Sequence, residues 1–219
     1  MKNLPIRILS AIAFSAVLSL VLLLYGCSGE NRESDHTPSV EPIEMPQNPE
    51  RLLFVGDSRT IDMFFDSDDE IDGMQSDGIT IYARHGNGFP YLTEAVEKCG
   101  MDHFDTLITW MGANDRGIFN SYRAYYEKLL RSGKQLVVCT VGPTEDEHLI
   151  DIDKKRYKNS LMVSFNKQLT EWATAHDVAV IDLYSYITEN HIRIDPADGI
   201  HYMPRPTTGI WEYILESLK

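Results

Sequence analysis

From residue 51 onward, two kinds of hydrophobic pattern alternate along the chain. Short runs rich in apolar and β-branched residues predict strands, and longer stretches with an apolar residue every three or four positions predict helices. Strands are expected at 51–55, 79–83, 105–111, 135–141 and 178–182. Within the last two ranges, 136–139 and 178–181 are almost wholly apolar. Such runs are typical of parallel strands that helices cover on both faces.

Helical spacing of apolar side chains is clear between and after the strands. The apolar stripes lie at 92–99, 118–130, 161–172 and 210–218. Aromatic residues in these stripes are expected to belong to the core rather than to contact a cofactor, because they keep the helical period. Strands that alternate with helices imply right-handed crossovers. The predicted fold class is therefore α/β, a three-layer α/β/α sandwich around a five-stranded parallel sheet.

The first 27 residues have the form of an export signal. Lys2 and Arg7 precede an uncharged, mostly apolar stretch at 8–25, and this order is typical of signal peptides. The sequence at 24–27 resembles the lipobox of bacterial lipoproteins, which implies that Cys27 is lipidated. The stretch is also just long enough to span a bilayer, so an uncleaved membrane anchor is the alternative. In both cases we expect the rest of the chain on the extracytoplasmic side, at the bacterial cell surface or in the periplasm.

Residues 28–49 are rich in Glu, Ser, Pro and Asn. A segment of this composition buries too little apolar surface to fold, so it is predicted to be a disordered linker. Residues 50–219 then remain for folded structure. A length of roughly 170 residues favours a single domain, which the linker would hold away from the membrane.

Charge and cysteine content narrow the range of partners. The chain carries a formal net charge of −13, and a mature form that begins at Cys27 would carry −15, because it loses Lys2 and Arg7. An acidic surface argues against nucleic acid and against anionic lipid as partners. The other two cysteines, Cys99 and Cys139, are expected to be buried free thiols, one at a helix end and one in a core strand.

Neither a metal nor an organic cofactor is expected. The acidic run at 66–72 begins like a calcium-binding loop, but the twelfth position of that loop, which needs a glutamate, is Ile79. A solvated loop is therefore expected at this run. No spacing of cysteines and histidines is typical of a zinc site.

Polar or glycine-rich clusters follow three of the predicted strands. Ser58 follows the first strand, Gly86 and Gly88 follow the second, and the segment 112–115, which contains Asn114, follows the third. The carboxyl ends of parallel strands meet at one edge of a sheet, so these clusters are expected to converge. Ser58 is also expected at a helix N-terminus, where free backbone N–H groups point outward.

An Asp-x-x-His pair, Asp198 and His201, lies near the C-terminus. A serine hydroxyl is a poor nucleophile until a base removes its proton. Histidine does this best when a carboxylate fixes its tautomer and stabilises the imidazolium. With Ser58, the chain supplies all three residue types. We therefore interpret the protein as a serine-dependent acyl hydrolase.

Four segments, in this order, resemble the four sequence blocks of the SGNH (GDSL-type) hydrolase family. They are Gly56-Asp57-Ser58, a glycine after the second strand, Gly112-x-Asn114-Asp115 and Asp198-x-x-His201. The resemblance covers about residues 51–218. It implies the SGNH hydrolase fold, which is flavodoxin-like.

The resemblance also implies roles for individual residues. Ser58 would be the nucleophile, His201 the base and Asp198 the carboxylate that orients it. The oxyanion hole would consist of the backbone N–H groups of Ser58 and Gly88 and the side-chain amide of Asn114. An amide donor aimed at a developing oxyanion raises the rate by roughly a hundred- to a thousandfold.

Three of these assignments have alternatives. Gly88 is preferred for the oxyanion hole because it directly precedes the predicted helix, but Gly86 is a second candidate. His148, which follows the fourth strand, is a rival to His201 as the base. Arg59 is expected to pair with a neighbouring acid, and the alternative is that it holds an anionic group of the substrate.

The sequence thus predicts a cell-surface serine ester hydrolase that works through an acyl-enzyme. Its substrate would be a carbohydrate ester or another small ester, and its N-terminal lipid or anchor would bind the membrane. One alternative is an O-acyltransferase that uses the same residues on an envelope glycan. Another is a glycan-binding lipoprotein without catalytic activity. Neither the acyl group nor the oligomeric state is predicted.

Overall fold

The computed structural model describes residues 51–67 and 69–219. The predicted signal peptide or anchor, Cys27 and the predicted linker at 28–49 lie outside the described residues. In the described part, no helix has both the length and the apolar character needed to cross a bilayer.

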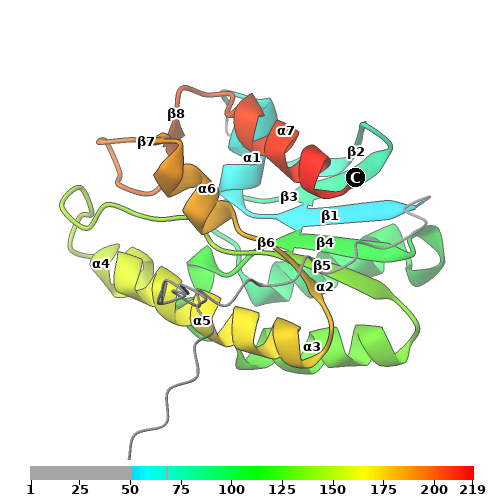
Figure 1. The fold of residues 1–219 in the computed structure, drawn as a ribbon. Helices are drawn as coiled ribbons and strands as arrows, with labels where there is room; N and C mark the ends of the chain where they lie inside the picture. The colour runs from blue at the N-terminus through cyan, green and yellow to red at the C-terminus, as the bar shows by residue number, and fades with distance from the viewer. Residues whose placement is uncertain (1–50, 68) are drawn as a thin grey trace, which may run out of the picture. The chain divides into compact units, whose positions relative to one another are not determined.

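A six-stranded sheet runs through the middle of the described domain (Figure 1). Its strands lie in the order β2 (Ile71–Ser76), β3 (Ile79–Ala83), β1 (Leu52–Gly56), β4 (Thr106–Trp110), β5 (Gln135–Cys139) and β6 (Ala179–Ile181). Each neighbouring pair from β3 to β6 is parallel. These five parallel strands are the five that the hydrophobic pattern predicts.

The sixth strand, β2, was not predicted, and the expected count of five is wrong for the sheet as a whole. β2 pairs antiparallel with β3 at the edge, and its register shifts between Asp72 and Met74. Asp77 and Gly78 both have positive φ, which is typical of the tight turn that joins two strands of a hairpin. The solvated loop expected at 66–72 is therefore wrong at its end, because Ile71 and Asp72 belong to β2.

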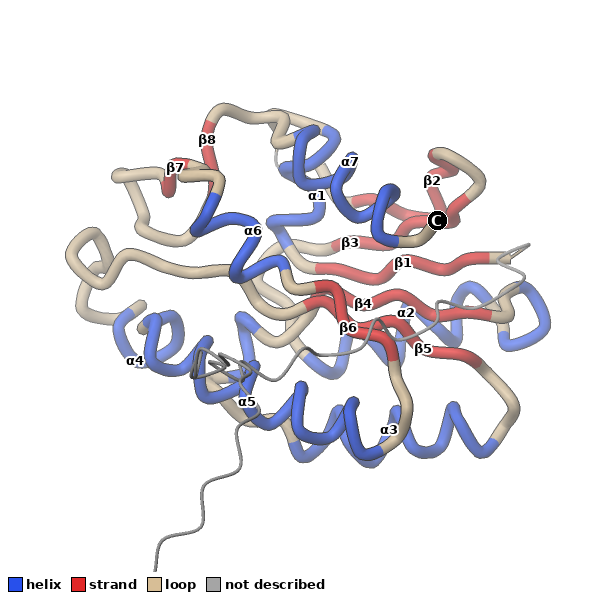
Figure 2. Tube along the Cα trace, in the orientation of Figure 1, coloured by secondary structure: helices blue, strands red, loops and turns tan. Residues whose placement is uncertain are grey.

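Helices cover both faces of the sheet, so the predicted three-layer α/β/α fold is confirmed (Figure 2). One face carries α2 (Phe89–Cys99), α3 (Asn120–Arg131) and α5 (Asn159–Ala175), and the other carries α1 (Ser58–Phe64), α6 (Leu183–Glu189) and α7 (Thr208–Ser217). Side chains of a strand point alternately to the two faces. Leu53 and Val55 of β1 accordingly pack on the first face, and Leu52 and Phe54 on the second.

Short elements fill the connections at the carboxyl edge of the sheet. The 3-10 turn η2 (Ala113–Asp115) follows β4, and α4 (Lys154–Tyr157) lies in the long connection from β5 to α5. A small antiparallel pair, β7 (Arg193–Ile194) and β8 (Tyr202–Met203), lies between α6 and α7. Another 3-10 turn, η1 (Met101–His103), follows α2 at the opposite edge.

Candidate active site

Ser58 is the first residue of α1, directly after the turn that ends β1. A side chain at Gly56 would collide with the hydroxyl of Thr60, so the close approach of strand and helix requires glycine there. Asp57 caps the helix, because its carboxylate accepts the backbone N–H of Arg59 at 3.1 Å. The turn and the cap together fix Ser58 in place with 8% of its surface exposed.

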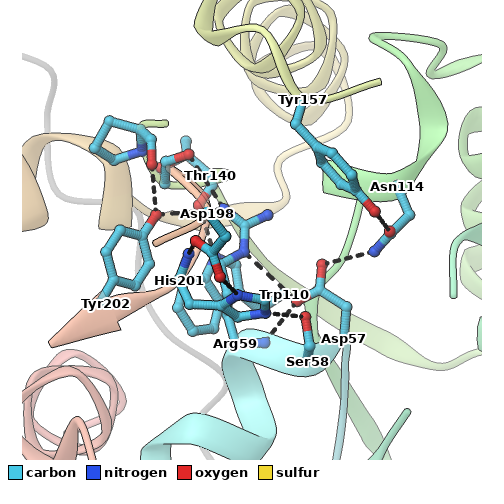
Figure 3. Close-up of polar contacts among 12 residues, drawn as sticks. Asp57, Ser58, Arg59, Trp110, Asn114, Thr140, Tyr157, Asp198, His201 and Tyr202 are labelled. Carbon is cyan, nitrogen blue, oxygen red and sulfur yellow. Dashed lines mark hydrogen bonds and ion pairs between the residues drawn. The ribbon is translucent and has the colours of Figure 1, made fainter. Parts of the chain in front are cut away.

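His201 lies in the loop between β7 and β8 and reaches Ser58 across 143 positions of sequence. Its Nε2 is 2.9 Å from Ser58 Oγ, and its Nδ1 is 2.6 Å from Asp198 Oδ2 (Figure 3). An ionised carboxylate can only accept, so Nδ1 carries the hydrogen and donates to Asp198. Nε2 then presents its lone pair to the serine hydroxyl. The structure therefore brings together the three residues that the sequence singles out.

Asp198 is held in its ionised form by hydrogen bonds. Besides the bond to His201, its Oδ1 accepts the backbone N–H groups of Ile200 at 2.7 Å and His201 at 3.0 Å. Burial alone would raise the pKa of Asp198, but these bonds outweigh it and lower the pKa to about 2. The carboxylate of Asp198 therefore stays charged at neutral pH.

A second carboxylate, Asp62, lies one helical turn after Ser58 on α1. Its side chain is 1% exposed, and neither carboxylate oxygen has a hydrogen-bond partner in the described structure. Burial raises the pKa of Asp62 to about 6, although the charges of His201 and Arg205 act in the opposite direction. Asp62 was not among the site residues predicted from the sequence.

Arg205 links Asp62 to the loop that carries His201. Its Nη1 is 3.7 Å from Asp62 Oδ1, and its Nη2 donates to Asp195 Oδ2 at 3.0 Å. Asp195 in turn donates its backbone N–H to the carbonyl of His201 at 2.7 Å. Arg205 therefore ties the helix of Ser58 to the loop of His201. No local sequence pattern predicts that Arg205 bridges Asp62 and Asp195, because these two acids are more than a hundred residues apart.

The predicted oxyanion donors lie on the carboxyl edge of the sheet beside Ser58. Asn114 is in η2, and its Nδ2 is 3.4 Å from Asp57 Oδ2. Gly88 caps α2 and packs directly against the carboxylate of Asp115, which leaves no room for a side chain there. Their role as oxyanion donors stays a prediction.

Gly86, the alternative to Gly88, lies two positions earlier in the same loop. It adopts φ +64°, and a side chain there would meet open space within 4 Å. Gly86 thus serves the turn through its backbone conformation. Gly88, by contrast, is the glycine that packs against the loop of Asn114, as the preferred assignment requires.

Arg59 pairs with the neighbouring acid, as expected. Its Nε is 3.6 Å from Asp57 Oδ1, and its Nη1 donates to Gly142 O and to Tyr202 Oη, both at 3.3 Å. The guanidinium also lies over the ring of Trp110, 5.7 Å from its centroid. The side chain is only 2% exposed, so this arginine lies beneath the site rather than on a surface that a substrate could reach.

His148, the rival base, pairs elsewhere. Its Nδ1 is 2.7 Å from Glu145 Oε2, and more than a third of its side chain is exposed. The imidazole that the structure joins to Ser58 is that of His201. The loop of Glu145 nevertheless borders the site, since its backbone N–H binds the carbonyl of Gly199 at 2.9 Å.

Within the described residues, no three or more His, Cys, Asp or Glu side chains gather as a metal site would require. Cys99 and Cys139 are free thiols, half-buried and buried respectively. A mainly apolar cavity of about 510 Å³ lies between α6, the β7–β8 pair and the start of α7. None of Ser58, Asp198 and His201 lines it, so its volume says nothing about the chemistry at Ser58.

Several solved structures are similar to this one. A protein described as a GDSL-like lipase from Parabacteroides merdae has a TM-score of 0.56 and 19% sequence identity, over 81% of this chain and 98% of that chain. An acylhydrolase from Bacteroides fragilis has a TM-score of 0.58 and 15% identity, over 81% and 90%. A catalytic mutant of an acetylxylan esterase from Geobacillus stearothermophilus has a TM-score of 0.56 and 17% identity, over 77% and 94%. No protein-family model and no curated protein sequence matches this chain. At these identities the likeness shows a shared fold, and the fold predicted from the sequence is confirmed.

Proposed function

We propose that this chain is a serine ester hydrolase of the SGNH (GDSL-type) family that works through an acyl-enzyme. The observation that carries the proposal is the continuous path of hydrogen bonds from Ser58 through His201 to Asp198. The fold shared with GDSL-type lipases and acetylxylan esterases supports it. A core histidine that served only structure would have no need of a serine at a helix N-terminus on one side and an ionised carboxylate on the other.

In the first half of the reaction, Ser58 Oγ attacks the ester carbonyl while His201 Nε2 takes its proton. Asp198 stabilises the imidazolium that forms. The carbonyl oxygen becomes negative and is stabilised by the N–H groups of Ser58 and Gly88 and by the amide of Asn114. The tetrahedral intermediate then collapses and its bond to the alkoxide oxygen breaks, while His201 gives its proton to that oxygen, so that the alcohol leaves. In the second half, water attacks the acyl-serine with the same base and releases the acid.

The substrate is proposed to be a carbohydrate ester or another small ester. The acetylxylan esterase among the similar structures supports this choice. The proposed location is the extracytoplasmic side of the membrane, with Cys27 as the lipidated residue of the tether. The support for this location is the signal-like order of charge and hydrophobicity in the first 27 residues.

Hydrolysis of p-nitrophenyl esters of increasing acyl length by the full chain in mild detergent tests the function. Ser58→Ala and His201→Ala are expected to lower kcat by about 10⁴-fold or more. His148→Ala is the matched control and should keep activity within about twofold, since its partly exposed imidazole pairs with Glu145 rather than with Ser58.

Turnover that survives in Ser58→Ala, or a larger loss in His148→Ala than in His201→Ala, would remove this mechanism. Release of acetate from an acetylated oligosaccharide tests the substrate class. An added sugar acceptor separates hydrolysis from transfer, because a transferase would move the acyl group to the sugar.

A further inference from the structure

The amide of Asn114 is held at both of its ends. Tyr157 donates its hydroxyl to Asn114 Oδ1 at 2.6 Å, and Asn114 Nδ2 donates to Asp57 Oδ2 at 3.4 Å (Figure 3). A flipped amide would turn its oxygen toward the carboxylate of Asp57, which can only accept. The carboxylate of Asp57 therefore selects one orientation of the amide. In that orientation the oxygen of Asn114 faces Tyr157, whose hydroxyl donates to it.

In that orientation, the NH₂ group of Asn114 still has a hydrogen to give. An amide nitrogen carries two hydrogens, and Asp57 takes one of them. The second remains for an oxygen that becomes negative beside Ser58. Because Tyr157 donates to the carbonyl end, it also polarises the amide in the sense that strengthens the N–H donors.

Tyr157 is itself anchored from several directions. The hydroxyl of Thr144 donates to the backbone carbonyl of Tyr157 at 2.6 Å, and the backbone N–H of Thr144 binds the side chain of Asn159 at 3.2 Å. The ring belongs to a small buried cluster with Leu149 and Ile200. Ile200 precedes His201 and donates its backbone N–H to Asp198. Tyr157 thus donates to the amide of Asn114 and shares a buried cluster with Ile200, the residue before His201.

We propose that Tyr157 is a positioning residue that fixes the Asn114 amide as an oxyanion donor. The inference rests on the proposed ester hydrolysis and deepens it, because it names how the oxyanion hole is kept in shape before a substrate arrives. Donors that are already oriented need no reorganisation when charge develops, and this is where most of their catalytic value lies. Burial raises the pKa of Tyr157, so its hydroxyl stays protonated and remains a donor at neutral pH.

Tyr157→Phe tests the proposal, because it removes the hydroxyl and keeps the ring that packs on Ile200. We expect kcat for p-nitrophenyl acetate to fall by about 10- to 100-fold, less than the loss from removing a donor outright. KM should change less than about twofold, since the interaction belongs to the transition state. The decrease in kcat should be the same from pH 6 to pH 9, because neither the amide of Asn114 nor the hydroxyl of Tyr157 changes its protonation state in this range.

The double variant with Asn114→Ala decides whether the hydroxyl acts through the amide. Asn114→Ala alone should lower kcat by about 100- to 1,000-fold, and Tyr157→Phe should add nothing to that loss. Tyr126→Phe is the matched control, since it removes a buried hydroxyl that binds Thr109 at 2.8 Å in the core. It should leave kcat within about twofold, because it lies away from the site.

Losses that multiply in the double variant, or a wild-type kcat in a folded Tyr157→Phe, would overturn the proposal. If Tyr157→Phe does not fold, a fluorinated tyrosine at position 157 replaces it. Its phenol is more acidic, so activity should fall at high pH as the donor ionises, and the wild-type pH profile would overturn the proposal. Wild-type protein that hydrolyses no ester would defeat the proposed function itself. The side-chain amide signals of Asn114 in NMR then still report whether Tyr157→Phe frees the amide.

Discussion

Two carboxylates of the site, Asp198 and Asp62, lie on different elements and are held in opposite ways. Asp198, in the β7–β8 loop, accepts three hydrogen bonds and is partly exposed. Asp62, on α1, is 1% exposed and has no hydrogen-bond partner in the described structure. Their pKa values are accordingly driven apart, to about 2 for Asp198 and about 6 for Asp62. Hydrogen bonds stabilise the charged form in the first case, and burial opposes it in the second.

The difference gives the two acids opposite effects on stability. The lowered pKa of Asp198 stabilises the folded state above about pH 4, and this contribution is lost as the pH falls through about 2. The raised pKa of Asp62 has no cost below about pH 4, but it destabilises the folded state fully above about pH 6. Near neutral pH the site therefore contains one acid that favours folding and one that opposes it.

The largest expected effect is a loss of kcat when Asp198, the acid that accepts three hydrogen bonds, is neutralised. Asp198→Asn should lower kcat by about 10³- to 10⁴-fold, because an amide can donate to Nδ1 and so favours the wrong tautomer of His201. Steady-state hydrolysis of p-nitrophenyl acetate at pH 7.5 measures it, with Asp62→Asn as the matched control. In Asp62→Asn, kcat should fall by less than about tenfold, since Asp62 does not bind the imidazole. A loss below tenfold in Asp198→Asn would show that the orienting role is wrong.

The second largest effect is expected from removing Arg205, which links the helix of Asp62 to the loop of Asp198. Arg205→Ala leaves the buried charge of Asp62 without its nearest cation, so the free energy of unfolding at pH 7.5 should fall by about 2 kcal/mol. Below about pH 5 the loss should be smaller, because Asp62 is then protonated. Urea denaturation at pH 7.5 and pH 4.5 measures both values.

Arg51→Ala is the control for this experiment. It removes an exposed pair with Asp105 and should cost less than about 1 kcal/mol at either pH. An equal loss at both pH values in Arg205→Ala would mean that the arginine does not act through the charge of Asp62.

The smallest expected effect is an increase in stability when Asp62 is neutralised. Asp62→Asn keeps the shape of the side chain and removes the buried charge, so it should raise the free energy of unfolding at pH 7.5 by about 1–2 kcal/mol. The gain should disappear at pH 4, where the wild-type acid is protonated. Thermal and urea denaturation at the two pH values test it, and a variant that is less stable at pH 7.5 would contradict the pKa inferred for this group.

Much of the fold follows from local pattern. The five parallel strands are rich in apolar and β-branched residues because both of their faces are covered. β2 was missed because Asp72, Gly73 and Gln75 break the apolar period, and an edge strand can tolerate this with one side unpaired. The Asp77-Gly78 turn was the available signal. β7 and β8 have two residues each, and two residues are too few to show an alternating hydrophobic pattern.

For the site, too, local sequence motifs predicted some residues and not others. Ser58, Asp198 and His201 were predicted because each lies in a short motif whose residue types carry its chemistry. Arg205 and Tyr157 lie in no such motif, and their contacts with Asp62 and Asn114 join side chains that are far apart in sequence. Asp62 follows Ser58 by four positions, and an acid on the buried face of a predicted helix was the one signal that could have drawn attention to it.

The 143 positions between Ser58 and His201 have a consequence for biosynthesis. On the proposed mechanism, a polypeptide emerging from the ribosome acquires Ser58 first and His201 143 positions later. A product that stops before His201 would lack the proposed base, however well its strands have paired. Ester hydrolysis would thus report that translation has passed the loop between β7 and β8, and termination before that loop would release no active enzyme.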